Sequence, residues 1–182
     1  MSAAVDITNP EEPKRVAIIA SNPSVSKQTG WPIGFWWAEL THPYCEFVEH
    51  GYKVDICSPD GGKLQADSWS DPRDQGRLMA DDLISLGFIY SPQHSALIEN
   101  SKPISRIEVG DYDAILFVAD EFVGQRMQPF WIEEEAKKLP DTNFMVSGRF
   151  EAHAVRDGNL ITGQQQYSAK AVARLVIEAL GV

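Results

Sequence analysis

The chain has 182 residues, 43% of them hydrophobic and 23% charged, with a formal net charge of −10 and a pI near 4.8. This composition is typical of one globular domain with a sizeable core and argues against a disordered chain. A surface this acidic does not suit nucleic acid or an anionic membrane, so we expect neither as a partner. No apolar run in the sequence approaches the length of a membrane span.

The N-terminal stretch, residues 1–13, is polar and contains Pro10 and Pro13, which predicts a flexible tail before a single domain over residues 14–182. It holds no apolar signal-peptide core. The two cysteines of the chain make no disulfide framework, which favours a cytoplasmic location. Their spacing matches no zinc pattern, and no glycine-rich phosphate-binding motif occurs, so we predict neither a metal nor a cofactor.

The first predicted elements are a strand, a helix and a second strand. Residues 15–20, which are apolar after Arg15, are typical of a strand buried on both faces of a parallel sheet. A helical pattern covers residues 35–50 with Pro43 inside it, and Gly51 is its expected C-terminal cap. Residues 52–57 alternate in polarity and predict the second strand, which ends in a turn of Ser, Pro, Asp and Gly.

The middle of the chain predicts helices and a third strand. Two short helices are expected around residues 76–86 and 92–99, and residues 113–118, which are apolar after Asp113, predict another buried strand. A further helix is expected at residues 129–139, where Glu–Lys pairs lie four residues apart, and Pro140 ends it.

The last part of the chain predicts a strand at residues 143–146 and then a hairpin. Residues 154–156 and 159–161 would be its strands, joined by the turn Asp157-Gly158. A terminal helix with an apolar stripe follows Ser168, which can cap it. Because strands alternate with helices, we predict an α/β fold, a flavodoxin-like doubly wound sandwich with a mostly parallel sheet.

Several motifs occur in a fixed order along nearly the whole chain. They are the segments 34–44, 51–62, 67–72, 111–118, 129–131, 157–164 and 168–182. In combination they resemble the Hsp31-type, glyoxalase-III-like branch of the DJ-1/PfpI (ThiJ/PfpI, class I glutamine amidotransferase-like) superfamily. The resemblance implies the same fold and, for an active member, cofactor-independent chemistry on small carbonyl compounds such as 2-oxoaldehydes.

The segment that carries the nucleophile in this family has no counterpart here. In the family, a strand like residues 114–118 leads through a Gly-Gly loop and a helix to another strand, which ends in a Cys-His elbow. Here residues 119–124 follow directly and resemble a later part of the family, and the chain contains no Cys-His dipeptide. Natural deletion, deliberate engineering, or residues absent from the printed sequence would each give this pattern.

The resemblance implies candidate site residues with acidic side chains. Glu39 matches the pocket acid that hydrogen-bonds the reactive cysteine in the family, so it is a candidate acid or base. The alternative is an inherited carboxylate bonded to nearby backbone. Asp120 and Glu121 fall where the family has an acidic cluster; neighbouring carboxylates can divide acid and base roles, whereas most such pairs lie in solvated loops. His153, before the hairpin, could face the same cleft.

Sulfur and aromatic residues give weaker signals. Cys57 ends a predicted strand and could reach the edge of the sheet where sites form, although a small buried residue is the simpler interpretation. Cys45, inside the predicted helix, is likewise interpreted as a small packed residue. Trp31, Trp36 and Trp37 lie close together, which predicts either a pocket or subunit contact, or else core packing.

Loss of the elbow strand would remove a central strand from the sheet and leave the neighbouring strands with unpaired backbone groups and an exposed apolar face. We therefore expect the remaining strands to close up, or a second copy to fill the space in an intertwined homodimer. Two functions are open. One is a non-catalytic binding, chaperone-like or regulatory protein that kept the fold. The other is an enzyme that converts a small carbonyl compound, or catalyses a hydration or hydrolysis, through Glu39.

Overall fold

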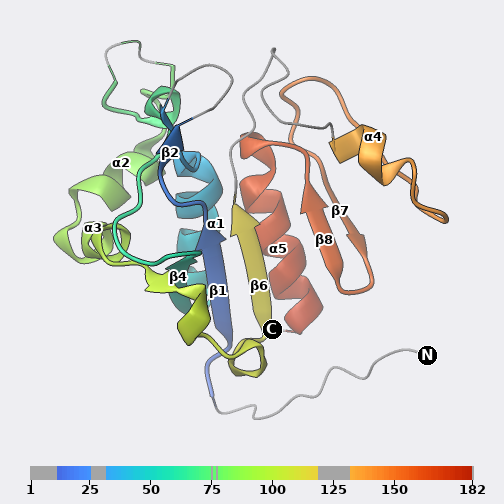
Figure 1. Ribbon diagram of the computed structural model, residues 1–182, viewed down its shortest axis with the longest axis horizontal. Helices are drawn as coiled ribbons and strands as arrows, with labels where there is room; N and C mark the ends of the chain where they lie inside the picture. Colours follow the sequence, from blue (N-terminus) through green and yellow to red (C-terminus); the bar gives the residue numbers. More distant parts are fainter. Residues whose placement is uncertain (1–11, 26–31, 75, 77, 119–131, 182) are drawn as a thin grey trace.

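The computed structural model describes residues 12–25, 32–74, 76, 78–118 and 132–181. Its main sheet has four parallel strands in the order β5-β4-β1-β6 (Figure 1). They are β1 (Arg15–Ala20), β4 (Lys53–Ser58), β5 (Lys102–Pro103) and β6 (Ala114–Val118). In the centre of the sheet, Ile18 of β1 lies opposite Ile56 on one side and Leu116 on the other.

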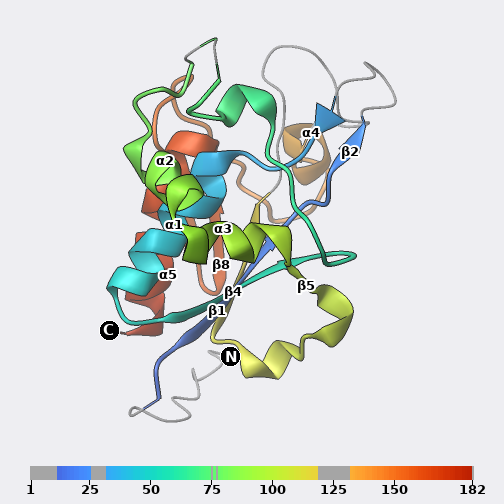
Figure 2. The ribbon, with the colours of Figure 1, turned by 90° about the vertical axis from the view of Figure 1, so that its left-hand side faces the viewer.

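Helices cover one side of this sheet, as Figure 2 shows, with the yellow segment of residues 104–111 on the other side. Helix α1 packs against β1 and β4, α5 and α2 each pack against α1, and α3 packs against α2. Their bounds are α1 (Trp37–Glu49), α2 (Leu83–Tyr90), α3 (Pro92–Glu99) and α5 (Ala169–Leu180). Within the described ranges, we find no helix with the length and apolarity that a membrane crossing requires.

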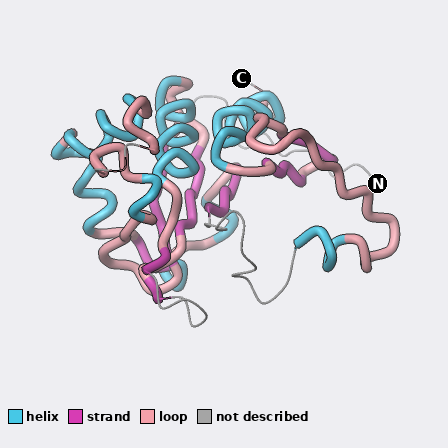
Figure 3. The backbone as a smooth tube through the Cα atoms, turned by 90° about the horizontal axis from the view of Figure 1, so that it is seen from above, coloured by secondary structure: helices cyan, strands magenta, loops and turns pink. Residues whose placement is uncertain are grey.

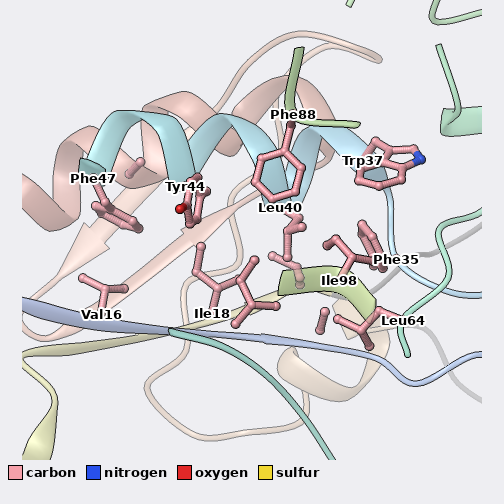
Figure 4. Close-up of a cluster of buried hydrophobic side chains, with 14 of the residues drawn as sticks. Val16, Ile18, Phe35, Trp37, Leu40, Tyr44, Phe47, Leu64, Phe88 and Ile98 are labelled. Carbon is pink, nitrogen blue, oxygen red and sulfur yellow. The ribbon is translucent and has the colours of Figure 1, made fainter. Parts of the chain in front are cut away.

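The hydrophobic core lies between the sheet and α1 (Figure 4). Alternate residues of β1 point into it, because successive side chains of a strand face opposite sides. The largest fully buried side chains include Phe35, Leu40, Phe47 and Phe88. The even-numbered residues of β1 and β6 therefore face the helices, and the odd-numbered residues face away from them.

Smaller elements surround this body. The short strands β2 (Ser24–Val25) and β3 (Pro32–Ile33) pair with each other, and β7 (Ala154–Asp157) forms a hairpin with β8 (Leu160–Gly163) that packs on α5. Viewed from above, α4 (Ile132–Ala136) lies at the rim of the molecule (Figure 3). The single-turn helices are η1 (Ser68–Ser70), η2 (Ile104–Arg106), η3 (Val109–Asp111) and η4 (Gln166–Ser168).

The predicted flavodoxin-like α/β fold with a parallel sheet is confirmed. The predicted hairpin is also present, but its turn lies one residue later than expected, at Gly158-Asn159, because Asp157 still pairs with Leu160; Gly158 has a positive φ of 59°. The helix predicted at 76–86 is displaced. It begins only at Leu83, because the Asp82 side chain accepts a hydrogen bond from the N–H of Ser85 and so fixes its N-terminus. Ser168 precedes α5 as predicted, but its side chain does not cap that helix.

The strand predicted at residues 143–146 is wrong. This segment has no strand structure, and the side chains of Met145 and Val146 are exposed. An apolar run becomes a strand only where a neighbouring strand can pair with it, and no strand among the described residues lies alongside this one.

Candidate functional site

The carboxyl ends of β1 and β4 share one edge of the sheet with the start of α1. Two contacts fix the segment that leads into α1. The Ser21 hydroxyl donates a hydrogen bond to the Gly34 carbonyl at 2.7 Å, and the Trp37 N–H donates to the Ser70 hydroxyl at 3.1 Å. The start of the helix is therefore held between the end of β1 and the segment that contains η1.

Glu39 lies in the first turn of α1, half-buried, and its N–H donates to the carbonyl of Trp36 at 3.0 Å. The N-terminus of a helix carries a partial positive charge, which stabilises a carboxylate at this position. Parallel α/β sheets place ligands at this edge. Glu39, the acid predicted from the sequence, therefore lies near the edge of the sheet at which α/β folds commonly bind ligands, and its role stays a prediction.

The tryptophans that precede Glu39 differ in their surroundings. Trp37 belongs to the core, with its ring edge-on to Phe35 at a centroid distance of 5.2 Å. Trp36 is 9% exposed, and its buried indole N–H has no hydrogen-bond acceptor in the part of the chain that the structure describes. Three other predicted site residues, Trp31, Asp120 and Glu121, lie outside the described residues.

His153 lies just before β7 and is tied to the start of α5. Its backbone N–H donates to the Ser168 hydroxyl at 3.1 Å, and its carbonyl accepts from the N–H of Gln164 at 3.1 Å. The ring nitrogen Nε2 is buried and has no hydrogen-bond partner among the described residues. These contacts place His153 by its backbone, and no hydrogen bond within the described ranges joins its imidazole to a carboxylate that would orient it as a base.

The two cysteines are unpaired, and neither has the setting of a nucleophile. Burial, followed by the charge of Asp55, raises the pKa of the fully buried Cys57 thiol. Burial, followed by the charge of Glu49, likewise raises the pKa of Cys45, which is half-buried on α1. Since the thiolate is the reactive form, a raised pKa lowers the nucleophilic reactivity of both thiols.

A buried polar cluster between α1 and α2 escaped the sequence reasoning. The Asp82 carboxylate, 4% exposed, pairs with His42 Nε2 at 2.8 Å and accepts from the Ser85 hydroxyl at 2.5 Å. The Ser85 hydroxyl also lies 2.7 Å from Thr41 Oγ1. Burial alone would raise the pKa of Asp82, but the hydrogen bonds from His42 and Ser85 outweigh it and hold the pKa below its usual value.

This cluster has the residue types of a catalytic triad but not the arrangement. In a triad the imidazole lies between the carboxylate and the hydroxyl, so that it can take the proton of the hydroxyl. Here Asp82 lies between His42 and Ser85, and the hydroxyl donates to the carboxylate. The cluster therefore fastens α2 to α1 and has no activated nucleophile. A sequence feature that could have indicated this cluster is Asp82, a residue type that caps helices, placed directly before an apolar run.

No set of three or more His, Cys, Asp or Glu residues in the described part of the chain is placed to hold a metal ion. Of the residues predicted for a site, Glu39 and Trp36 both lie at the start of α1, near the carboxyl edge of the sheet, and the contact described between them is the hydrogen bond from the Glu39 N–H to the Trp36 carbonyl.

Comparison with known proteins shows likeness at the level of structure. No family model matches the sequence, and neither does any curated protein. The Rapid Encystment Protein of 24 kDa from Francisella tularensis superposes with a TM-score of 0.77 at 16% identity, over 93% of this chain and 100% of that one. Glyoxalase III from Candida albicans superposes with a TM-score of 0.70 at 17% identity, over 91% of this chain and 97% of that one. The chain has the fold of these members of the DJ-1/PfpI superfamily.

Proposed function

We propose that the chain is a DJ-1/PfpI-like protein without the usual Cys-His nucleophile, which acts as a non-catalytic binding or chaperone-like homodimer in the cytoplasm. The observation that carries this proposal is the state of the thiols. Burial raises the pKa of both Cys45 and Cys57, and Cys57 is closed to solvent, so the chemistry on which the family's nucleophile depends has no group to perform it. The two unpaired cysteines support the cytoplasmic location.

A second candidate function is an enzyme that uses Glu39 in a rebuilt site. The position of Glu39 in the first turn of α1, at the ligand-binding edge of the sheet, favours it. The sequence resemblance to glyoxalase-III-like proteins suggests a 2-oxoaldehyde as substrate, and the alternative reaction is hydration or hydrolysis of a small molecule. A carboxylate can relay a proton at such a site without a thiol.

The test is consumption of methylglyoxal by the purified protein after its intact mass has been matched to the printed sequence. We expect no turnover above that of buffer, and the same result for Cys57→Ser and Cys45→Ser. Turnover that disappears in Glu39→Gln, but persists in the control Glu99→Gln, would replace the proposal by the enzyme. Glu99 is a suitable control because it is an exposed helix residue paired with Lys63.

A mass larger than that of the printed sequence would also overturn the proposal. It would mean that a segment is present in the protein and missing from the sequence as printed, and the cysteine mechanism of the family would again be the leading hypothesis.

A further inference from the structure

Strand β6 forms one edge of the main sheet among the described residues. Its inner edge pairs with β1, and no described strand pairs with its outer edge. Exposed strand edges are ordinarily guarded by a charged residue, a proline or a bulge. The five residues of β6, Ala114–Val118, are all apolar and include none of these devices. The outer edge of β6 therefore presents a row of backbone hydrogen-bond donors and acceptors that no charged residue, proline or bulge protects from pairing with another strand.

The side chains of β6 divide between the two faces of the sheet. Ala114, Leu116 and Val118 belong to the core beneath α1. Ile115 and Phe117 point to the opposite face, where Ile115 is half-buried and Phe117 is 73% exposed. An aromatic side chain this exposed in the last residues of a sheet strand is an apolar surface that another chain would cover with a gain in stability.

We propose that a second copy of this chain pairs with β6 in antiparallel fashion, about a two-fold axis at Leu116, and so joins two four-stranded sheets into one. This register places Phe117 directly beside the partner's Ile115, and Ile115 beside the partner's Phe117, on the same face. The exposed ring of Phe117 in each copy then covers the smaller, half-buried side chain of Ile115 in the other copy. A surface that is complementary to itself in this way is what a two-fold interface requires.

The charges around β6 favour a second copy over a charged partner. Two chains of net charge −10 repel each other over most of their surface, so they can meet only where charge is absent or balanced. Strand β6 has no charge, and the adjacent Asp113 is neutralised by Lys14 at 3.2 Å. Antiparallel pairing moves the two Lys14–Asp113 pairs to opposite ends of the interface. A basic or acidic partner would find no counter-charge along this strand.

This inference rests on the homodimer in the proposed function and not on the absence of catalysis. Its test is the mass of the full chain in solution by analytical ultracentrifugation over a wide concentration range. We expect a dimer for the unchanged protein, and for Phe117→Asp a dissociation constant raised by about tenfold or more, as for the loss of a central aromatic contact. The control is Leu83→Asp, because Leu83 on α2 is 72% exposed and lies outside β6, so this variant stays dimeric.

The outcomes separate the two proposals. A monomer at every concentration would overturn the homodimer and, with it, this interface. A dimer that persists unchanged in Phe117→Asp would keep the homodimer and overturn β6 as its site. Because Phe117 is exposed, its replacement leaves the core intact, and an unchanged circular dichroism spectrum verifies this.

A cross-linking measurement tests the register independently. We mix Ile115→Cys protein with Phe117→Cys protein under mild oxidation, since directly opposed residues of antiparallel strands lie within the distance that a disulfide spans. The expected product is a disulfide-linked pair of the two variants. Cross-linking no greater than that of a mixture containing Leu83→Cys would overturn the register.

Discussion

At Gly34, a single missing side chain determines how the start of α1 is held. A Cβ atom at this position would lie 1.8 Å from the carbonyl oxygen of Gln65. This oxygen belongs to backbone that is itself fixed, since the N–H of Asp67 donates to the Phe35 carbonyl at 2.8 Å. The two segments can lie this close only because residue 34 has no side chain, and their contact sets the position of Glu39 one turn further on.

We expect Gly34→Ala to lower the free energy of unfolding by about 2–4 kcal/mol, because the methyl group forces two backbone segments apart. Urea denaturation followed by circular dichroism measures this. The matched control is Gly87→Ala within α2, where a Cβ meets nothing within 4 Å. Removal of a helical glycine there raises the stability by up to about 1 kcal/mol. Equal effects of the two substitutions would contradict the close approach at Gly34.

At the scale of elements, an ion cluster joins α1 to α5. Glu46 of α1 accepts from Arg174 Nε at 2.9 Å and from Lys170 Nζ at 3.3 Å, and its side chain is almost fully buried. Burial alone would raise the pKa of Glu46, but the hydrogen bonds and charges of Arg174 and Lys170 outweigh it and hold the pKa below its usual value. The ionised carboxylate therefore stabilises the packing of the two helices.

We predict that Glu46→Ala destabilises the protein by about 2 kcal/mol at pH 7, because a hydrogen-bonded charge is lost and its partners are left unpaired. A carboxyl whose pKa is lowered by folding contributes stability above its unfolded pKa and loses it as the pH falls through the folded pKa. The difference between the two proteins should therefore shrink towards zero in acid. Urea denaturation at a series of pH values measures it.

The comparison for this cluster is Glu99→Ala, which removes an ion pair with Lys63 between two exposed side chains. Such a pair contributes at most about 1 kcal/mol at any pH. A loss in Glu46→Ala that is no larger than in Glu99→Ala, or that stays constant down to acid pH, would refute the role of Glu46.

Most elements could be predicted from the sequence because their signals are local. Strand β6 is a continuous apolar run, as is β1 after Arg15, and the hairpin of β7 and β8 carries its turn residues. The segment 143–146 was mistaken for a strand because its pairing depends on distant residues. The candidate site was predictable in part. The place of Glu39 near the start of a helix follows from the helical pattern, whereas its choice as a site residue came from the family resemblance and stays a prediction. The cluster of Asp82 with His42 joins residues forty positions apart, which no local pattern reveals.

At the scale of the whole molecule, the net charge of −10 opposes association between molecules, whereas the edge of β6 favours it. Charge repulsion between molecules is strong at pH 7 and vanishes near the pI of about 4.8. We predict that turbidity develops fastest near that pH, where chains can approach one another freely. We also predict that Phe117→Asp delays it, because a charge on an edge strand blocks strand addition. Identical turbidity curves for the two proteins would mean that association in acid proceeds elsewhere.

The acidic composition therefore affects the solubility of the protein as well as its choice of binding partners. An unguarded apolar strand is a template on which sheets can extend without limit, and a closed pair of strands is one way to stop that extension. The surface charge is another, because it keeps apart the chains that have not yet found a partner. High salt at neutral pH screens this repulsion, so the conditions that weaken the charge are those in which the protein would precipitate first.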